Sequence, residues 1–321
     1  MIVYPVIIAT LCRYEHFKKC VDSLSKCTLA NQTELVIGLD YPLKESHRFG
    51  YDKIVSYIDN ISGFKTVTIL KTYVNIGASQ NFKRLYEYAY SKYDAVIMTE
   101  DDNIFSPCFL EFMNKALNKY KNEDKILSVS GYTALTYYNR SKNRLILTYD
   151  VSAWGTGYWK HKSDVYFNKN RSYYISIVSN FRSMLKIYMV YPRLLSMLLY
   201  MLKNNLRWGD TEKTTYNIIN HAFQLRPSMS YVRNIGQDGS GLHSGMDNDI
   251  MNQEISCEDH FYFAESDSIV NLLSESKITQ KGSFTLGMPK SKMRFVASLV
   301  KIFIEWCIYK FSFNCRNRNI K

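Results

Sequence analysis

Short apolar runs alternate with longer segments of helical periodicity along the first hundred residues. Four runs rich in β-branched residues have the length and pattern of strands buried on both faces, at 3–10, 34–39, 66–71 and 95–99. Between them, apolar residues at helical spacing predict helices at 15–26, 51–61 and 78–92. This alternation predicts an α/β fold with a doubly wound, mostly parallel sheet.

Polar residues follow each of these predicted strands. In doubly wound sheets, ligands bind at the carboxyl ends of the parallel strands, so residues at those ends are candidates for a site. The candidates at this edge are Arg13, Asp40, Asn75, Glu100, Asp101 and Asp102.

The acidic triplet 100–102 follows the fourth predicted strand directly. Adjacent carboxylates repel one another, and a divalent cation removes that cost. Carboxylate oxygens suit Mg²⁺ and Mn²⁺, which keep open positions for water and phosphates. The alternative is a solvated acidic turn before a helix at 108–120, which Ser106 and Pro107 would open. The position at the end of a central strand favours the metal site.

Length and composition narrow the function classes. The 321 residues carry a net charge of +12 and are 46% hydrophobic, which excludes a disordered or disulfide-stapled protein. The positive charge is compatible with binding to nucleic acid, to an anionic membrane or to a phosphorylated small molecule. Seven cysteines without metal-binding spacing are expected to be reduced thiols in a cytosol, and the amino terminus resembles a strand and not a signal peptide. Pro192 interrupts the apolar run 187–202, so a membrane span is not expected there.

Several segments in order resemble the nucleotide-sugar half of GT-A glycosyltransferases. They are ATLCR (9–13), Asp40, NIGASQNFKR (75–84), TEDDN (99–103), SAWGTGYW (152–159), WGDTE (208–212) and RPSMSYVRNIGQDGSGLHSG (226–245). Within that fold the sequence is most similar to the inverting N-acetylglucosaminyltransferase I type and bacterial polysaccharide glycosyltransferases. The resemblance implies a GT-A domain with a donor half at 1–125, an acceptor and catalytic half at 126–288, and a tail at 289–321.

The resemblance also implies roles for individual residues. Asp102 would hold Mn²⁺ or Mg²⁺ against the diphosphate, and His243 is a second candidate ligand. Arg13 and Asp40 would contact the nucleoside base, and Glu100 and Asp101 the sugar or ribose. The residues that the resemblance assigns to donor binding are Thr10, Arg13, Asp40, Asn75, Gly77, Asn81, Glu100, Asp101 and Trp154.

An inverting transfer needs a carboxylate that takes the proton of the acceptor hydroxyl, separate from the metal site. The resemblance assigns this role to Asp210. The sequence departs from the family pattern here, with Gly209 before Asp210 and Thr211 after it, which leaves Glu212 as a rival base. Asp210 is also well placed to cap a helix at 211–220.

The carboxyl-terminal residues 290–321 carry eight Lys and Arg against one Glu. Their apolar residues at helical spacing predict an amphipathic basic helix, which indicates peripheral contact with the cytoplasmic face of a membrane. The alternative is a helix packed on the domain with a solvated basic face. Because the basic residues gather near apolar segments, nucleic-acid binding is not expected.

The sequence therefore predicts a metal-dependent inverting glycosyltransferase with a nucleotide-diphosphate donor, a UDP-sugar being favoured. The expected acceptor is a glycan or lipid-linked oligosaccharide in surface polysaccharide synthesis. Two alternatives stay open: a GT-A-fold protein that binds sugar or lipid without turnover, and a sugar-nucleotide nucleotidyltransferase. The latter class has a glycine-rich loop after the first strand, and ATLCRYEHFKK contains no glycine.

Overall fold

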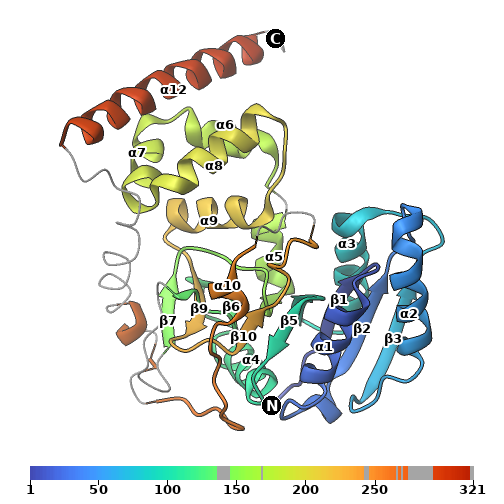
Figure 1. Cartoon of the computed structure of the whole chain (residues 1–321). Helices are drawn as coiled ribbons and strands as arrows, with labels where there is room; N and C mark the ends of the chain where they lie inside the picture. Colours follow the sequence, from blue (N-terminus) through green and yellow to red (C-terminus); the bar gives the residue numbers. More distant parts are fainter. Residues whose placement is uncertain are drawn as a thin grey trace. The chain divides into compact units, whose positions relative to one another are not determined.

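An eight-stranded sheet carries the order β3-β2-β1-β4-β8-β6-β9-β7 in the computed structural model (Figure 1). Its parallel half consists of β1 (Val6–Thr10), β2 (Glu34–Leu39), β3 (Thr66–Lys71) and β4 (Ala95–Glu100). The strand β8 (Thr156–Trp159) pairs antiparallel with both β4 and β6 (Ile126–Ser130). The remaining strands are β7 (Leu145–Thr148) and β9 (Phe223–Pro227). The predicted α/β class with a mostly parallel sheet is confirmed.

The structure describes residues 1–135, 145–167, 169–241, 246–264, 267–268, 270–273 and 292–318, with the backbone alone at 166–167, 292–295 and 312–318. The chain divides into two units. The first unit comprises Met1–Ile146, Ser152–Lys162 and Leu225–Leu272, and the second comprises Leu147–Val151, Ser163–Gln224 and Leu273–Lys321. Both units are discontinuous in sequence.

Helices of the first unit flank the parallel strands close to where the periodicity predicts them. They are α1 (Tyr14–Leu24), α2 (Arg48–Ile58), α3 (Gly77–Tyr90) and α4 (Phe109–Lys119), with 3₁₀ turns at Ala30–Gln32 and Glu45–His47 and a short α10 (Asn248–Met251). Leu85 and Ala89 of α3 pack on Ile7, Val36 and Val96 of the sheet, all fully buried. Burial on both faces explains why these central strands are continuous apolar runs.

A second, two-stranded sheet was not predicted from the sequence. β5 (Asn103–Phe105) pairs antiparallel with β10 (Val232–Asn234), with Asn103 opposite Asn234. Both strands have three residues, which is too short for an alternating pattern to stand out. This pairing brings the segment after β10 to the end of β4.

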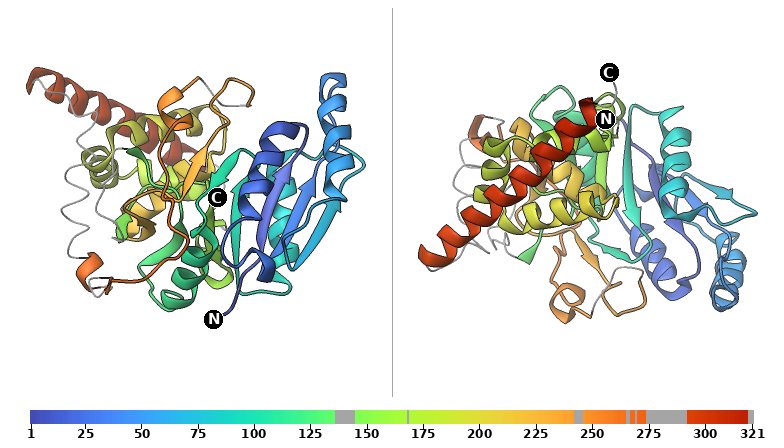
Figure 2. Two further views of the ribbon diagram at one scale, coloured as in Figure 1. Left: turned by 60° about the horizontal axis from the view of Figure 1, so that its bottom comes forward. Right: turned by 90° about the horizontal axis from the view of Figure 1, so that it is seen from above.

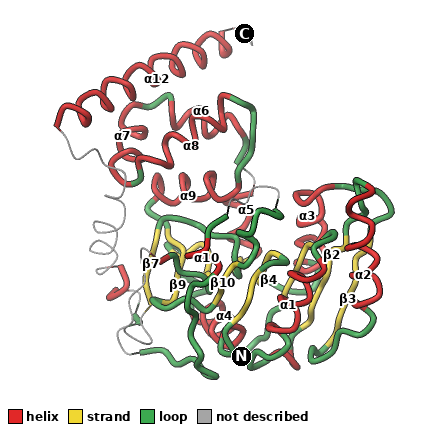
Figure 3. The backbone as a smooth tube through the Cα atoms, viewed as in Figure 1, coloured by secondary structure: helices red, strands yellow, loops and turns green. Residues whose placement is uncertain are grey.

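Helices joined by short loops dominate residues 169–220 of the second unit (Figure 3). They are α6 (Arg171–Val178), α7 (Phe181–Val190), α8 (Pro192–Lys203) and α9 (Gly209–Asn220), and α5 (Lys160–Phe167) precedes them across the unit boundary. Asn170 and Asn180 cap α6 and α7 through their side chains, and Pro192 opens α8, so the apolar run 187–202 is divided between two helices.

The tail of the second unit forms α12 (Lys292–Arg318), which lies along α6 and α7 (Figure 2). No helix in the described part of the chain is long and apolar enough to cross a membrane. The six cysteines whose side chains are described are all free thiols.

Candidate functional site

A charged cluster joins the carboxyl ends of β1 and β4. The Arg13 guanidinium lies 2.5 Å from Asp101 Oδ1 and 2.7 Å from Asp102 Oδ2 through the same nitrogen, Nη2. Thr10, the last residue of β1, donates its hydroxyl to Asp101 Oδ2 at 2.8 Å. Because β1 and β4 are paired in parallel, the residues that follow them emerge side by side. Four predicted site residues are thereby brought together.

Burial sets the electrostatics of this cluster. Asp101 and Asp102 are 7% and 6% exposed. Burial raises the pKa of Asp101 and the neighbouring Asp102 raises it further, while Arg13 opposes this by favouring the charged form. Burial alone would lower the pKa of Arg13, but the two carboxylates outweigh it and raise that pKa. Arg13 is therefore a permanent cation between two carboxylates.

One donor of Arg13 is not used by the protein. Its Nη1 is buried and has no hydrogen-bond partner among the described residues. A buried guanidinium donor without an acceptor is costly, and the oxygen of an anionic ligand would satisfy it. Arg13 thus combines a structural ion pair with a free donor at the ligand-binding edge of the sheet.

The segment after β10 closes over Asp102. Asn234 donates its side-chain amide to Asp102 Oδ1 at 2.7 Å, and the Ile235 N–H donates to the Asp102 carbonyl at 2.8 Å. A Cβ built on Gly236 would lie 2.0 Å from Asp102 Oδ2, so only glycine fits this close approach. Sequence reasoning missed Asn234 and Gly236 as site residues. The sequence offered one indication of them. Gly236 closely follows the polar residue Asn234 within the segment 226–245, which resembles GT-A enzymes.

The same segment is tied to α1 by a contact between an imidazole and a carboxylate. His16 Nε2 lies 3.0 Å from Asp238 Oδ2. Asp238 Oδ1 accepts from the backbone N–H of Ser240 at 2.9 Å and from its hydroxyl at 2.6 Å. These two hydrogen bonds, with His16, lower the pKa of Asp238 to about 2. Nothing in the sequence pointed to His16.

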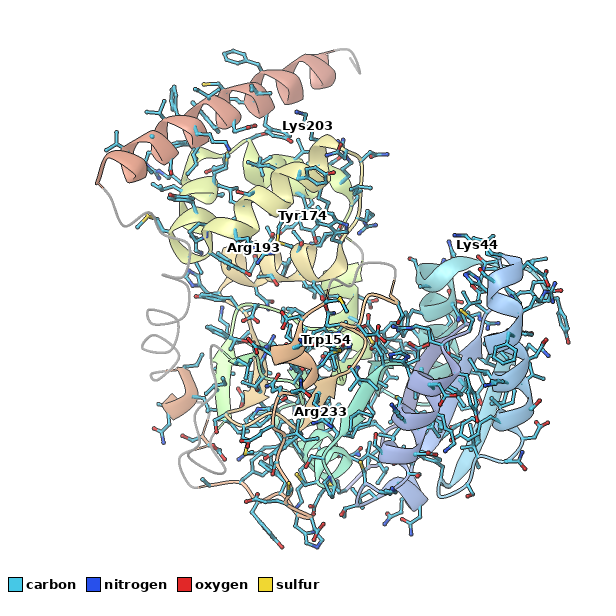
Figure 4. The ribbon with its side chains drawn as sticks, viewed as in Figure 1. Lys44, Trp154, Tyr174, Arg193, Lys203 and Arg233 are labelled. Carbon is cyan, nitrogen blue, oxygen red and sulfur yellow. The ribbon has the colours of Figure 1, made fainter. Side chains whose placement is uncertain are left out.

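Trp154, labelled in Figure 4, contacts the acidic triplet through Glu100. Its indole Nε1 donates to Glu100 Oε2 at 2.9 Å, and its ring meets Tyr132 edge-on with centroids 4.6 Å apart. The hydrogen bond holds both Glu100 and the indole in place, as expected for a wall of a binding site. Trp159, the other tryptophan of this segment, is fully buried and belongs to the core.

Asp40 organises the loop between β3 and α3. Its Oδ1 accepts from the N–H groups of Tyr41 (2.9 Å) and Ile76 (3.0 Å) and from the Thr72 hydroxyl (2.9 Å). Its Oδ2 accepts from the Gly77 N–H at 2.8 Å, where α3 begins with a positive φ of 78°. A buried carboxylate at a helix N-terminus is electrostatically favourable. Asp40 therefore fixes the loop, and its contact with a nucleoside base stays a prediction.

Asn81, one of the residues assigned to donor binding, is buried within the fold. This residue is 1% exposed, donates to the Gly38 carbonyl at 2.8 Å and accepts from Arg84 Nε at 2.9 Å. It is a buried bridge between β2 and α3. Asn75, in contrast, is partly exposed and donates to the Tyr41 carbonyl at 2.6 Å.

The two base candidates belong to the second unit, on the first turn of α9. Glu212 is 7% exposed and accepts from Arg207 Nε and Nη2 at 2.9 and 2.7 Å, a bidentate pair. Asp210 is exposed. It lies inside the helix and does not cap it, because the N-cap is Trp208, whose ring stacks on Tyr200 at 5.7 Å. Glu212 is thus occupied by a structural ion pair, and Asp210 is the accessible carboxylate.

Hard oxygen donors for a divalent cation are present at Asp101 and Asp102. Among the described residues, no group of three or more His, Cys, Asp or Glu side chains is arranged to enclose a metal ion, and His243 lies outside those residues. An Mg²⁺-type ion that shares substrate phosphates needs only one or two carboxylates from the protein. The pair therefore fits a metal shared with a phosphorylated ligand and does not fit a cage made by the protein alone.

Comparisons with known proteins give distant structural matches. The Staphylococcus aureus protein TarS matches with a TM-score of 0.36 and 13% identity over 49% of this chain, which corresponds to 28% of the TarS chain. A TarS fragment, 1–349, matches with a TM-score of 0.43 and 13% identity, covering 100% of this chain and 92% of the fragment. The mannosyltransferase PcManGT of Pyrobaculum calidifontis, solved with GDP-Man and Mn²⁺, matches with a TM-score of 0.37 and 9% identity, covering 96% and 87% of the two chains. No protein-family model and no curated protein sequence matches this chain.

The close approach of Gly236 to Asp102 predicts that Gly236→Ala is destabilising. The new methyl group would lie 2.0 Å from Asp102 Oδ2 and 3.0 Å from Arg13 Nη1, so the cluster must shift. We expect the free energy of unfolding to fall by about 1–3 kcal/mol, the usual cost of overpacking, in urea titrations. Gly209→Ala is the matched control, since its nearest neighbour would lie 4.0 Å away. Equal stability of the two variants would contradict the packing described.

The depressed pKa of Asp238 predicts a pH dependence. A carboxylate with a folded pKa of about 2 and an unfolded pKa near ~3.9 stabilises the fold above about pH 4, and this contribution is lost as the pH falls to about 2. Urea unfolding should therefore show Asp238→Asn less stable than the wild type at pH 7 and equal to it near pH 2. Ser240→Ala, which removes one donor, should reproduce part of the change. An Asp238→Asn stability curve parallel to that of the wild type would refute this account.

Proposed function

We propose that this chain is a GT-A glycosyltransferase that transfers a sugar from a nucleotide-diphosphate donor with inversion. The observation that carries the proposal is the buried Arg13, Asp101 and Asp102 cluster at the carboxyl ends of β1 and β4. Doubly wound sheets bind their ligands at this edge. Residues of the segments that resemble GT-A enzymes in sequence, 9–13, 99–103 and 226–245, supply this cluster and its cover.

The donor diphosphate is proposed to bind at this cluster. Arg13 Nη1 would donate to a phosphate oxygen, in place of the nucleoside base that the family resemblance implies for Arg13, and Asp102 would hold Mn²⁺ or Mg²⁺ jointly with the diphosphate. The cation would stabilise negative charge on the leaving diphosphate. Trp154, fixed by Glu100, offers an aromatic face against which a sugar ring or base can stack. A UDP-sugar is the favoured donor, as the family resemblance implies.

Asp210 is proposed as the catalytic base. Inversion requires one carboxylate to accept the proton of the attacking acceptor hydroxyl. Asp210 is exposed, whereas Glu212 is held by two hydrogen bonds from Arg207, which favours Asp210 over its rival. The aromatic pair of Trp208 and Tyr200 next to it suits a glycan or lipid-linked oligosaccharide acceptor of surface polysaccharide synthesis.

The site argues against one of the two alternatives. A nucleotidyltransferase would need a glycine-rich loop after β1, where this chain has none. An accessible carboxylate beside an aromatic pair suits a sugar-binding protein without turnover as well as it suits an enzyme. The transfer assay below separates that alternative from an enzyme.

Donor binding is tested with a thermal-shift panel of UDP-, GDP- and dTDP-sugars, with and without Mn²⁺. We expect one nucleotide class to raise the Tm more when Mn²⁺ is present, since binding to the native state stabilises it. Asp102→Asn should abolish the Mn²⁺-dependent part of this shift. Asp94→Asn, which alters another carboxylate of the first unit paired with Lys121, should keep it. A Tm shift in Asp102→Asn equal to that of the wild type would remove Asp102 from the donor site.

The base is tested by comparing Asp210→Asn with Glu212→Gln. Asp210→Asn should keep the donor-induced Tm shift and lower the transfer rate by about 10²–10⁴-fold, the usual contribution of a general base. Glu212→Gln should instead lower the free energy of unfolding by about 1–3 kcal/mol, because it weakens the charge-assisted hydrogen bonds with Arg207. Full transfer activity in Asp210→Asn would exclude it as the base.

A further inference from the structure

One side of α12 packs on the other helices of the second unit. Ile302 is 5% exposed, and the Trp306 indole donates to the Ser179 carbonyl at 2.8 Å. The Tyr309 hydroxyl donates to the Leu199 carbonyl at 3.1 Å, and the Trp306 ring meets that of Phe181 edge-on at 5.6 Å. The helix is therefore anchored by the apolar face that the sequence assigned to a membrane.

The opposite side of α12 is also apolar, and it is exposed. Six large side chains on it are between 51% and 68% exposed: Val296, Val300, Phe303, Ile304, Ile308 and Phe311. At 100° per residue they fall within an arc of about 140° on the helical wheel, which we call the outer face. Lys301 and Lys310, both exposed, lie at the two edges of this arc. Among the side chains of α12 that the structure describes, the two lysines therefore border the apolar arc, while the helix itself is packed on α6 and α7 as the alternative expected.

The second unit as a whole is basic. Residues 163–224 of the second unit carry eight Lys and Arg against three Asp and Glu, and α12 adds six against one. Arg193 and Lys203 of α8 are exposed examples (Figure 4). Most of the +12 excess of the whole chain therefore belongs to this unit. A positive potential over this unit attracts anionic surfaces and repels a second copy of the same unit.

We propose that the outer face of α12 docks the second unit on an anionic lipid bilayer. The six apolar side chains would enter the boundary between headgroups and acyl chains, and Lys301 and Lys310 would reach the phosphates on either side. The other side of α12 is held by α6, α7 and α8, so the helix lies along the surface and does not cross it. This inference goes beyond the proposed activity and does not depend on it, because it concerns a different surface.

Vesicle sedimentation of the full chain tests the proposal without donor or acceptor. The probes are vesicles of phosphatidylcholine alone and of phosphatidylcholine mixed with phosphatidylglycerol. We expect the wild type to pellet with the mixed vesicles and to be released by high salt. Ile304→Gln/Ile308→Gln should lower the partition coefficient by about tenfold or more, since two exposed apolar side chains lose their membrane contact.

Matched variants separate insertion from charge and from folding. Leu43→Gln/Val270→Gln removes two similarly exposed apolar side chains of the first unit and should leave the partition coefficient unchanged. Lys301→Gln/Lys310→Gln should weaken binding to the anionic vesicles and reduce its salt dependence. All three double variants alter exposed side chains, so their Tm should equal that of the wild type. Deletion of the tail is a poorer test, because it would also uncover α6 and α7.

Three outcomes would overturn the proposal. The wild type could stay in the supernatant with the mixed vesicles, or the Ile304→Gln/Ile308→Gln variant could pellet as the wild type does. The third is a concentration-dependent dimer in sedimentation velocity that this variant dissolves while vesicle binding is absent. That result would reassign the outer face to contact between copies of the chain.

Discussion

The buried ion pair of Arg13 with two adjacent carboxylates is the constraint on which the candidate site depends. Asp101 and Asp102 are both nearly inaccessible to solvent, so their mutual repulsion would be severe without a cation between them. Arg13 can supply it because β1 ends beside β4 and the chain turns at once into α1. The remaining carboxylate oxygens are satisfied by Thr10 and Asn234, which makes the cluster a fully connected polar network except for one guanidinium nitrogen.

Carboxylates of this chain fall into two groups with different physical roles. Asp40 and Glu212 are buried and accept several hydrogen bonds from their own surroundings, so they hold a loop and a helix start in place. Asp102 is buried as well, but it shares Arg13 with Asp101 at the ligand-binding edge, and Asp210 is exposed on its helix. Exposure to solvent, and not position in a motif, distinguishes Asp210 from Glu212 on the first turn of α9.

The sequence predicted the parallel half of the sheet well. Two strands, 34–39 and 66–71, have the predicted bounds, because continuous apolar runs are a strong local signal. The acidic triplet and Arg13 were expected at one edge and do meet there. Asn234, Gly236 and the pair of His16 with Asp238 were missed, since they act across more than a hundred residues of chain and no local pattern records such contacts. The hydrogen-bond partners of Asn81 and Glu212 were not foreseen for a related reason, because a motif does not show whether a side chain is already occupied.

The carboxyl-terminal helix shows most clearly which properties are local to the sequence and which depend on tertiary packing. By itself the sequence determined that this segment is helical, basic and rich in apolar residues, because composition and spacing are local properties. Which apolar residues face the protein and which face outward was decided by packing alone: Trp306 and Ile302 bind the second unit, and Ile304 and Ile308 remain exposed. The same holds for the site. The residue types of the site and the order of its strands along the chain followed from the sequence. The ion pairs of Asp101 and Asp102 with Arg13, and the close approach of Gly236 to Asp102, arise only where distant segments meet in space.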